Sequence, residues 1–274
     1  MTPLPFKLAM IQMEVRGGDP GRNLERAVDQ ISEAASQGAQ IILLPECLDL
    51  GWTHPSSQIM AEPIPEGLPC TTLSMAAKKH QVFICAGLTE KDDTAVYNSA
   101  VLINPEGEVI LKHRKLNELE IGHDYYAQGD RLNVAKTEYG TIGLMICADG
   151  FANDQVISRS LCYMGADVIL SPCAWARPAD HDNEADPYGT VWRESYQPVA
   201  KTFSTAIFGT SNVGLITAGP WEGRKCVGCS LAIDANGEEM FQGPYGEECI
   251  LYAEVAPQPR PARGTGWGSP IPLK

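Results

Sequence analysis

The sequence predicts an α/β protein with two β-sheets and helices on their outer faces. Apolar segments of strand length alternate along the chain with segments whose apolar residues recur at helical spacing, which is typical of this class. A hairpin-rich segment near residues 97–111 adds antiparallel strands. The chain has 274 residues, 44% of them hydrophobic, so it can bury a large core. We expect one domain over residues 1–255 and a tail over residues 256–274.

The first elements follow a strand, helix, strand order. Residues 6–13 are apolar enough for a first strand, and a Gly- and Pro-containing turn ends it. Asp19 suits the N-cap of the helix that follows and Pro20 its first turn. Residues 40–45 form a continuous apolar run, as expected of a strand covered on both faces. That strand leads directly into the ionisable Glu46.

The middle of the chain combines a helix with several strands and a long loop. The second arm of the hairpin leads into Lys115, and residues 116–131 are polar and aromatic without periodicity. Such a segment predicts a loop, and long loops in compact domains are usually functional. The regular elements expected here are a helix at 71–80 and strands at 82–88, 97–103, 108–111, 132–135 and 141–147.

The last third begins after Cys147, where an apolar strand ends abruptly. Residues 256–274 are rich in Pro and Gly, so they are not expected to fold alone but to lie over the body or a partner subunit. The elements expected in between are a helix at 156–164, a strand at 167–171, a loop at 172–187, a helix at 188–202, a strand at 206–212 and a strand, turn and strand at 228–255.

The charge balance excludes several classes of partner. With 21 basic and 34 acidic residues, the chain has a net charge of -13. Such a surface repels nucleic-acid phosphates and anionic lipid, so we expect neither as a partner. The start of the chain lacks the pattern of a signal peptide, and no apolar run approaches membrane-spanning length. The sequence therefore predicts a cytoplasmic protein without a membrane partner.

The nine cysteines indicate reduced thiols rather than a disulfide framework, because their number is odd and no secretion signal precedes them. Cys226 and Cys229 have CxxC spacing, but no second pair of ligands accompanies them at the spacing of a zinc site. We therefore interpret both as structural, and we expect neither a metal nor another cofactor.

Three expected strands end in residues that could act together on an amide: Glu46, Lys115 and Cys147. A thiol with a pKa near about 8.5 is mostly protonated at neutral pH, so a carboxylate must accept its proton as it attacks. The ammonium and the backbone N–H of Ala148 could each stabilise the oxyanion by about 3 to 4 kcal/mol. Each residue also has a simpler interpretation: the two charges could form an ion pair, and the cysteine could be buried in a strand.

Three segments resemble the signature segments of the nitrilase superfamily, the carbon-nitrogen hydrolases: Leu44–Glu46, His113–Lys115 and Gly143–Asp149. Their order and separations agree with that family, and the similarity covers roughly residues 5–255. The resemblance implies a four-layer αββα sandwich of two mixed sheets, a Glu-Lys-Cys triad, a thioester intermediate, no metal, and a homodimer or larger homo-oligomer.

The resemblance gives Glu46 as general base, Lys115 as oxyanion stabiliser and Cys147 as nucleophile. Family members usually carry a second glutamate in the following loop, at a position that falls on Gly122 here. Glu118 and Glu120 lie nearby. We favour Glu120, which would serve if the loop bulges by two residues, although either could be a solvated loop charge.

The residues near the cysteine favour an amide over a nitrile. True nitrilases tend to have Trp and Glu after the cysteine, whereas Ala148 and Asp149 follow it here. Carbamoyl-amino-acid hydrolases often place arginines there to hold a carboxylate; Arg177 on the next loop could substitute, or could form a surface salt bridge. The residues expected to wall the pocket, unless they pack in the core, are Trp175, Phe151 and Tyr125.

Other functions stay open at this point. The substrate could be a small amide, an N-carbamoyl compound or a nitrile. The chain could instead be a catalytically idle interaction protein. Such a protein would have no chemical reason to keep Glu46, Lys115 and Cys147 together. A glutaminase module would need a nucleotide-binding domain, and the phosphate-binding GxxxxGK[ST] motif is absent; the GxSxG motif of serine hydrolases is absent too.

Overall fold

The computed structural model describes residues 3–257, in which most strands belong to two six-stranded mixed sheets. The strand order is β15-β1-β2-β3-β4-β5 in the first sheet and β14-β13-β10-β8-β7-β6 in the second. In each sheet, three neighbouring parallel strands are flanked by antiparallel strands. The first sheet consists of β1 (Phe6–Gln12), β2 (Ile41–Leu43), β3 (Phe83–Asp92), β4 (Ala95–Ile103), β5 (Val109–Arg114) and β15 (Cys249–Val255).

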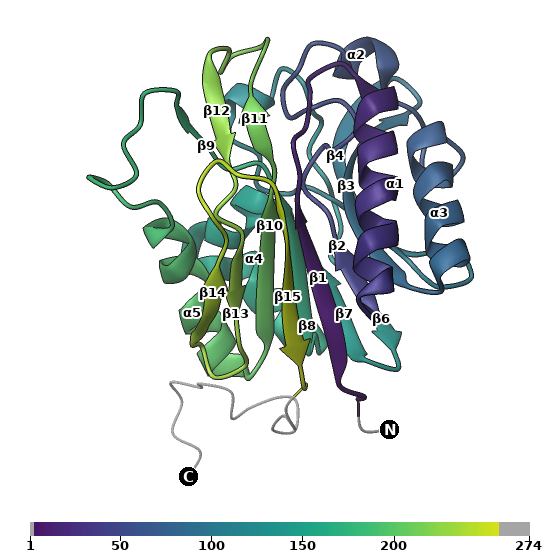
Figure 1. Cartoon of the computed structure of the whole chain (residues 1–274), viewed down its shortest axis with the longest axis vertical. Helices are drawn as coiled ribbons and strands as arrows, with labels where there is room; N and C mark the ends of the chain where they lie inside the picture. The colour runs from purple at the N-terminus through teal and green to yellow at the C-terminus, as the bar shows by residue number, and fades with distance from the viewer. Residues whose placement is uncertain (1–2, 258–274) are drawn as a thin grey trace.

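The second sheet and a small third sheet come mainly from the second half of the chain. The third sheet lies beyond the ends of the parallel strands, at the top of Figure 1. The strands of the second sheet are β6 (Val134–Thr137), β7 (Gly140–Leu144), β8 (Val168–Cys173), β10 (Ala206–Ser211), β13 (Leu231–Ile233) and β14 (Glu239–Gln242). Those of the third are β9 (Ala176–Pro178), β11 (Val213–Leu215) and β12 (Arg224–Val227).

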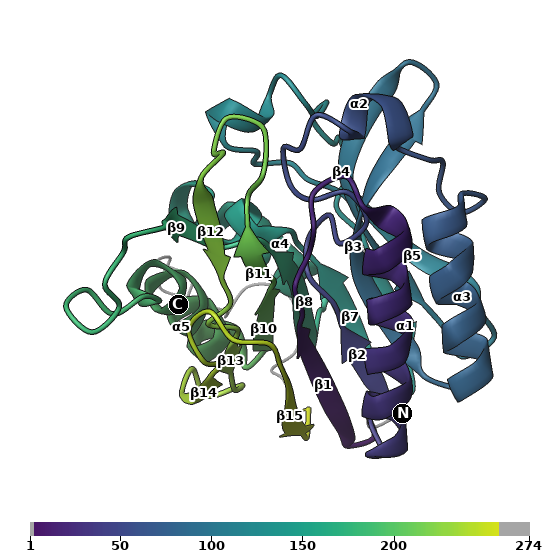
Figure 2. The same ribbon diagram turned by 45° about the horizontal axis from the view of Figure 1, so that its top comes forward.

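Helices cover the outer faces of the two large sheets. Helices α1 (Pro20–Ser36) and α3 (Leu68–His80) lie side by side on the first sheet, and α4 (Val156–Met164) and α5 (Thr190–Phe203) lie on the side of the second (Figure 2). As expected, the Asp19 side chain caps α1 by accepting a hydrogen bond from the Arg22 N–H, and Pro20 begins the helix. The remaining short helices are α2 (Ser57–Met60), η1 (Glu120–Gly122), η2 (Cys147–Phe151) and η3 (Asn153–Gln155).

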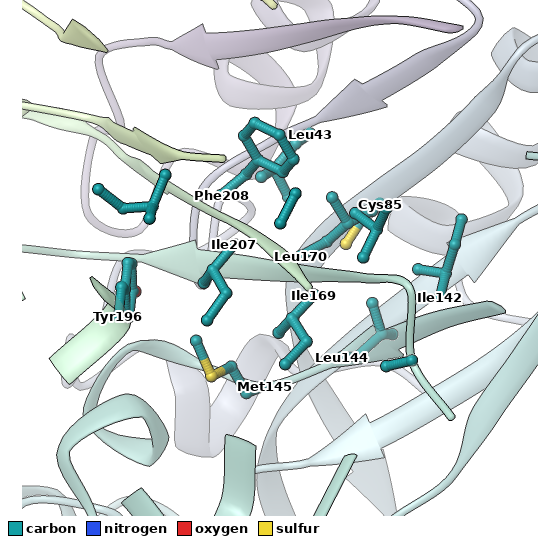
Figure 3. Packing of buried hydrophobic residues seen from close by; sticks show 14 of the residues in the cluster. Leu43, Cys85, Ile142, Leu144, Met145, Ile169, Leu170, Tyr196, Ile207 and Phe208 are labelled. Atoms are coloured by element: carbon teal, nitrogen blue, oxygen red, sulfur yellow. The ribbon is translucent and has the colours of Figure 1, made fainter. Parts of the chain in front are cut away.

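The main core fills the space between the two large sheets. Leu43 and Cys85 from the first sheet pack with Leu144, Leu170 and their neighbours from the second (Figure 3). A second apolar cluster joins the first sheet to α1 and α3. The αββα sandwich expected from the sequence is confirmed, because each sheet has one face in the shared core and the other covered by helices.

The elements expected from periodicity are present, with shifts of a few residues at their ends. Helix α3 begins at Leu68, before the expected residue 71, and β5 continues to Arg114 rather than ending at residue 111. The short helix α2 and the small third sheet were not expected; strand β9 lies inside the segment expected to be a loop. Elements of three or four residues are too short to show a period in the sequence.

Most of the expected tail, residues 258–274, lies outside the described residues. Within the part of the chain that is described, no helix combines the length and apolar character needed to cross a membrane.

Candidate active site

Segments from both large sheets bring Glu46, Lys115 and Cys147 to one cavity. Glu46 follows β2, Lys115 directly follows β5, and Cys147 opens η2 just after β7. All three residues are buried, yet all three line a cavity of about 290 Å³. The strand ends that the sequence singled out therefore meet at one place in the fold.

Lys115 lies between two carboxylates. Its Nζ is 2.8 Å from Glu46 Oε1 and 2.9 Å from Glu118 Oε1. The Asn98 amide donates to both acids, at 2.7 Å to Glu46 Oε1 and 3.1 Å to Glu118 Oε2. Asn98 is opposite Lys115 because the Lys115 N–H donates to the Asn98 carbonyl across the β4–β5 pair, at 2.9 Å. The ammonium is thus fixed in position and its charge is compensated.

The structure places Glu118, and not Glu120, beside Lys115, which corrects the preference for Glu120. Glu120 is exposed at the start of η1, whereas the Glu118 side chain is only 5% exposed. A Cβ atom at Gly122 would lie 2.6 Å from Glu118 Cγ. The Glu118 side chain therefore fills the space next to the position where the resemblance placed the second glutamate, and the loop does not bulge to bring Glu120 in.

Burial and neighbouring charges set the protonation of the three groups. Burial raises the pKa of Glu46 above its ordinary value, although the Lys115 charge opposes this. Burial alone would lower the pKa of Lys115, but the Glu46 and Glu118 charges raise it well above its ordinary value. Burial, a hydrogen bond with Cys173 and the Glu46 charge raise the pKa of the Cys147 thiol. The site therefore holds an ammonium beside a protonated thiol that needs a base to become a nucleophile.

Cys147 occupies a sharp turn. Its φ angle is 44°, in the left-handed region that side-chain-bearing residues rarely adopt. Its N–H donates to Ser171 Oγ on β8 at 3.2 Å. Such strained positions persist only where the surroundings hold them, and they are frequent at functional sites.

Asp149 joins this turn to the segment that carries Lys115. One of its oxygens accepts from the Ile146 N–H at 2.9 Å and from His113 Nε2 at 2.7 Å. The other accepts from the N–H groups of Leu116 and Asn117, at 3.1 and 2.8 Å. Burial would raise the pKa of Asp149, but these hydrogen bonds outweigh burial and lower it. A buried carboxylate thereby fixes the two segments relative to each other.

Aromatic side chains form a large part of the cavity wall. Phe151 and Trp175 line it, as expected, and so does Arg177, which also forms an ion pair with Asp186. Tyr125 does not line it, which corrects that expectation. Its neighbour Tyr126 is buried outside the lining, and its hydroxyl accepts from the Thr53 N–H at 2.9 Å. Four further lining residues were not predicted from the sequence: Trp52, Tyr188, Trp192 and Trp221.

Ala148 also lines the cavity, at the start of η2 and next to Cys147. Cys226 and Cys229 are buried free thiols that do not line this cavity. Among residues 3–257, no three His, Cys, Asp or Glu side chains are grouped so that they could hold a metal ion.

Comparison with known proteins gives a consistent result. The sequence profile described as carbon-nitrogen hydrolase matches residues 7–260. A nitrilase of Pyrococcus abyssi is 31% identical over 253 residues, which cover 91% of this chain and 89% of the relative. An omega-amidase of Bos taurus is 35% identical over 187 residues, 62% of this chain and 67% of the relative.

The fold is also similar to that of solved structures. One is a mutant amidase from Nesterenkonia sp. AN1, in which the acetamide moiety of fluoroacetamide is covalently added at the active-site cysteine. It superposes with a TM-score of 0.77 and covers 93% of each chain at 18% sequence identity. At this identity the likeness concerns the fold.

Proposed function

This chain belongs to the carbon-nitrogen hydrolase family, and we propose that it hydrolyses a small amide or N-carbamoyl compound through a cysteine thioester. One observation supports the proposal most strongly. The Lys115 ammonium contacts both Glu46 and Glu118, and it does so in a cavity that Cys147 also lines. Amide hydrolysis needs a nucleophile, a proton acceptor and a fixed positive charge near the developing oxyanion. These residues supply all three.

The first half of the reaction forms the acyl-enzyme. Glu46 accepts the proton of the Cys147 thiol as Sγ bonds to the amide carbon, and the carbonyl oxygen becomes an oxyanion. Lys115 and the Ala148 N–H stabilise that oxyanion. When the oxyanion collapses, the carbon–nitrogen bond breaks, and Glu46 returns the proton to the departing nitrogen. Ammonia leaves a primary amide, and a thioester remains on Cys147.

The second half releases the acid. Glu46 accepts a proton from a water molecule that attacks the thioester carbon, and the same positive groups stabilise the second oxyanion. The carbon–sulfur bond then breaks and the sulfur regains its proton from Glu46. One water is consumed, one carboxylic acid and one ammonia are formed, and the enzyme returns to its starting state.

Glu118 acts as a positioning residue for Lys115. It accepts a second hydrogen bond from the ammonium beside that of Glu46, and Asn98 links the two carboxylates. Losing one carboxylate would leave Lys115 free to shift toward the other, away from the oxyanion position. Correct placement within about 1 Å can decide the rate by about 100-fold.

The amide is favoured over the nitrile by two observations. Ala148 and Asp149 follow the nucleophile, in place of the Trp and Glu that tend to follow it in true nitrilases. Among the relatives, the omega-amidase of Bos taurus and the Nesterenkonia amidase carry names that indicate amide substrates. Because the Pyrococcus abyssi relative is named a nitrilase, the test also includes nitriles.

The test is a screen for ammonia release from small amides, ureido acids and nitriles. We expect release from amides or ureido acids, and its complete loss in Cys147→Ala. Cys249→Ala is the matched control, because Cys249 is a half-buried thiol on β15, outside the cavity. Equal rates in wild type and Cys147→Ala on every active compound would contradict the proposal.

A further inference from the structure

We infer that the acyl group of the natural amide carries an uncharged aromatic ring, which binds between two aromatic walls of the cavity. This inference rests on the proposed function, because it names the substrate class of the same site. Six of the lining residues are aromatic, and four of these are tryptophans: Trp52, Phe151, Trp175, Tyr188, Trp192 and Trp221. The whole chain contains 5 tryptophans, so this residue type is concentrated at the cavity.

The first wall is a continuous set of rings beside the nucleophile. Trp175 and Trp192 are stacked with ring centroids 4.5 Å apart and planes 19° apart. Phe151 lies 5.3 Å from the Trp192 ring, and Phe151 belongs to the same short helix as Cys147. The Trp192 Nε1 donates to the Tyr188 hydroxyl at 2.8 Å, which fixes both rings. Rings held in this way form a binding surface that needs little reorganisation.

The second wall comes from other parts of the chain. Trp52 lies in the loop after Glu46, and Trp221 lies in the connection between β11 and β12. Their rings meet edge to face, with centroids 5.1 Å apart and planes 69° apart. Lys115 Nζ lies 5.5 Å from the centre of the Trp52 ring, so this wall reaches the catalytic ammonium. A ring bound against Trp52 would therefore lie close to the reacting groups.

The size of the cavity suits one ring and a carboxamide. An apolar cavity of about 150 Å³ in another protein is large enough to hold benzene. The present cavity, of about 290 Å³, has space for a phenyl ring together with the amide group. Acetamide would leave most of that space unfilled, and the aromatic walls would then stabilise nothing.

The charges in the cavity favour an uncharged acyl group. Glu46 and Lys115 pair with each other, and Arg177 pairs with Asp186. The Arg177 guanidinium also lies 5.6 Å from the centre of the Tyr188 ring. Every charged side chain lining the described cavity already has an ion-pair partner, so a charged acyl group would have to compete with an existing pair. Arg177 Nε and Glu46 Oε2 have no hydrogen-bond partner among the described residues and could bind an uncharged polar group.

Three amides separate the contributions of size and aromaticity: phenylacetamide, cyclohexylacetamide and acetamide. In the two ring-bearing amides a methylene group separates the ring from the carbonyl, so their intrinsic reactivities are similar. We expect kcat/KM for phenylacetamide to exceed that for acetamide by roughly 100-fold and that for cyclohexylacetamide by about fivefold. Equal kcat/KM for the two ring-bearing amides, or a preference for acetamide, would overturn the inference while the proposed function stands.

A variant locates the preference in the aromatic walls. Trp221→Leu replaces a half-buried ring at the edge of the cavity, so the fold should tolerate it. We expect the ratio of kcat/KM for phenylacetamide to that for acetamide to fall at least fivefold. The control is Tyr252→Leu, which removes a half-buried ring on β15 outside the cavity and should leave the ratio unchanged. An unchanged ratio in Trp221→Leu would count against the inference.

A binding measurement does not depend on turnover. Cys147→Ala should bind phenylacetamide more tightly than cyclohexylacetamide, measured by the change in tryptophan fluorescence or by calorimetry. Equal affinities would contradict the aromatic preference. If the wild-type protein releases no ammonia from any amide although the Cys147→Ala protein shows this preference, the proposed reaction fails and the binding inference survives.

Discussion

At the scale of single residues, the Glu118 side chain occupies the space beside Gly122. Gly122 has no side chain, and the Glu118 side chain lies against it while contacting Lys115. The three atoms that a Cβ at position 122 would meet first all belong to Glu118. Removing the Glu118 side chain would therefore open space for a longer residue at position 122.

This relation leads to a rescue experiment. Glu118→Ala should lower kcat by about 100-fold, because a buried ammonium loses one of its two carboxylates. The double variant Glu118→Ala with Gly122→Glu should recover part of that loss, since the new carboxylate starts beside the vacated space. The control Glu120→Gln changes an exposed glutamate of the same loop and should keep full activity. Full activity in Glu118→Ala would refute a role for Glu118.

The pKa of Glu46 gives a second prediction at this scale. The proposed base must be deprotonated, so kcat/KM should rise with pH as Glu46 loses its proton. Because burial raises the pKa of Glu46 above 4.5, the acid limb of the profile should lie above that value. The measurement is the pH dependence of kcat/KM on an active amide, over a range where the protein stays folded. An acid limb at or below pH 4.5 would show that this carboxyl is not the base.

At the scale of elements, the turn at η2 depends on Asp149. Asp149→Asn would direct amide hydrogens at backbone N–H groups that now donate to the carboxylate. We expect the free energy of unfolding to fall by about 2 kcal/mol or more, measured by urea denaturation, together with a loss of activity. Asp154→Asn is the control, because Asp154 is exposed in the neighbouring η3 and asparagine tolerates its φ angle of 55°. Equal stability losses in the two variants would contradict this role of Asp149.

The elements also show how far the sequence could predict the structure. Glu46 and Cys147 could be recognised because an apolar run stops there at a carboxylate or a thiol, and Lys115 because it follows the second arm of the hairpin. The choice between Glu118 and Glu120 could not be made, because the loop has no period that says which side chain turns inward. Trp52 and Trp221 could not be assigned to a wall either, since only the packing of distant loops brings them together.

At the scale of the whole molecule, the two helices over the second sheet carry exposed apolar residues. Val156 on α4 and Val191 on α5 are 54% and 44% exposed, and α4 contacts α5. Contiguous exposed apolar patches are common at interfaces between copies of a chain, whereas single exposed apolar residues are normal. We therefore keep the expectation of a homodimer or larger assembly as a proposal.

Val156→Glu tests that proposal. The residue is exposed at the start of α4, where a negative charge is favourable, so the fold of one copy should be unaffected. We expect light scattering after size exclusion to give an oligomer for wild type and a smaller species for the variant. A wild-type monomer would refute self-association, and an unchanged oligomer in the variant would place the interface elsewhere.

The most direct test of the central claim is the mass of the enzyme quenched during turnover of an active amide. If Cys147 is the nucleophile, a fraction of the protein should gain the mass of the acyl group minus one hydrogen. Digestion should place that gain on the peptide that contains Cys147, and Cys147→Ala should show none. An acyl adduct on another residue, or an identical adduct in Cys147→Ala, would contradict the account.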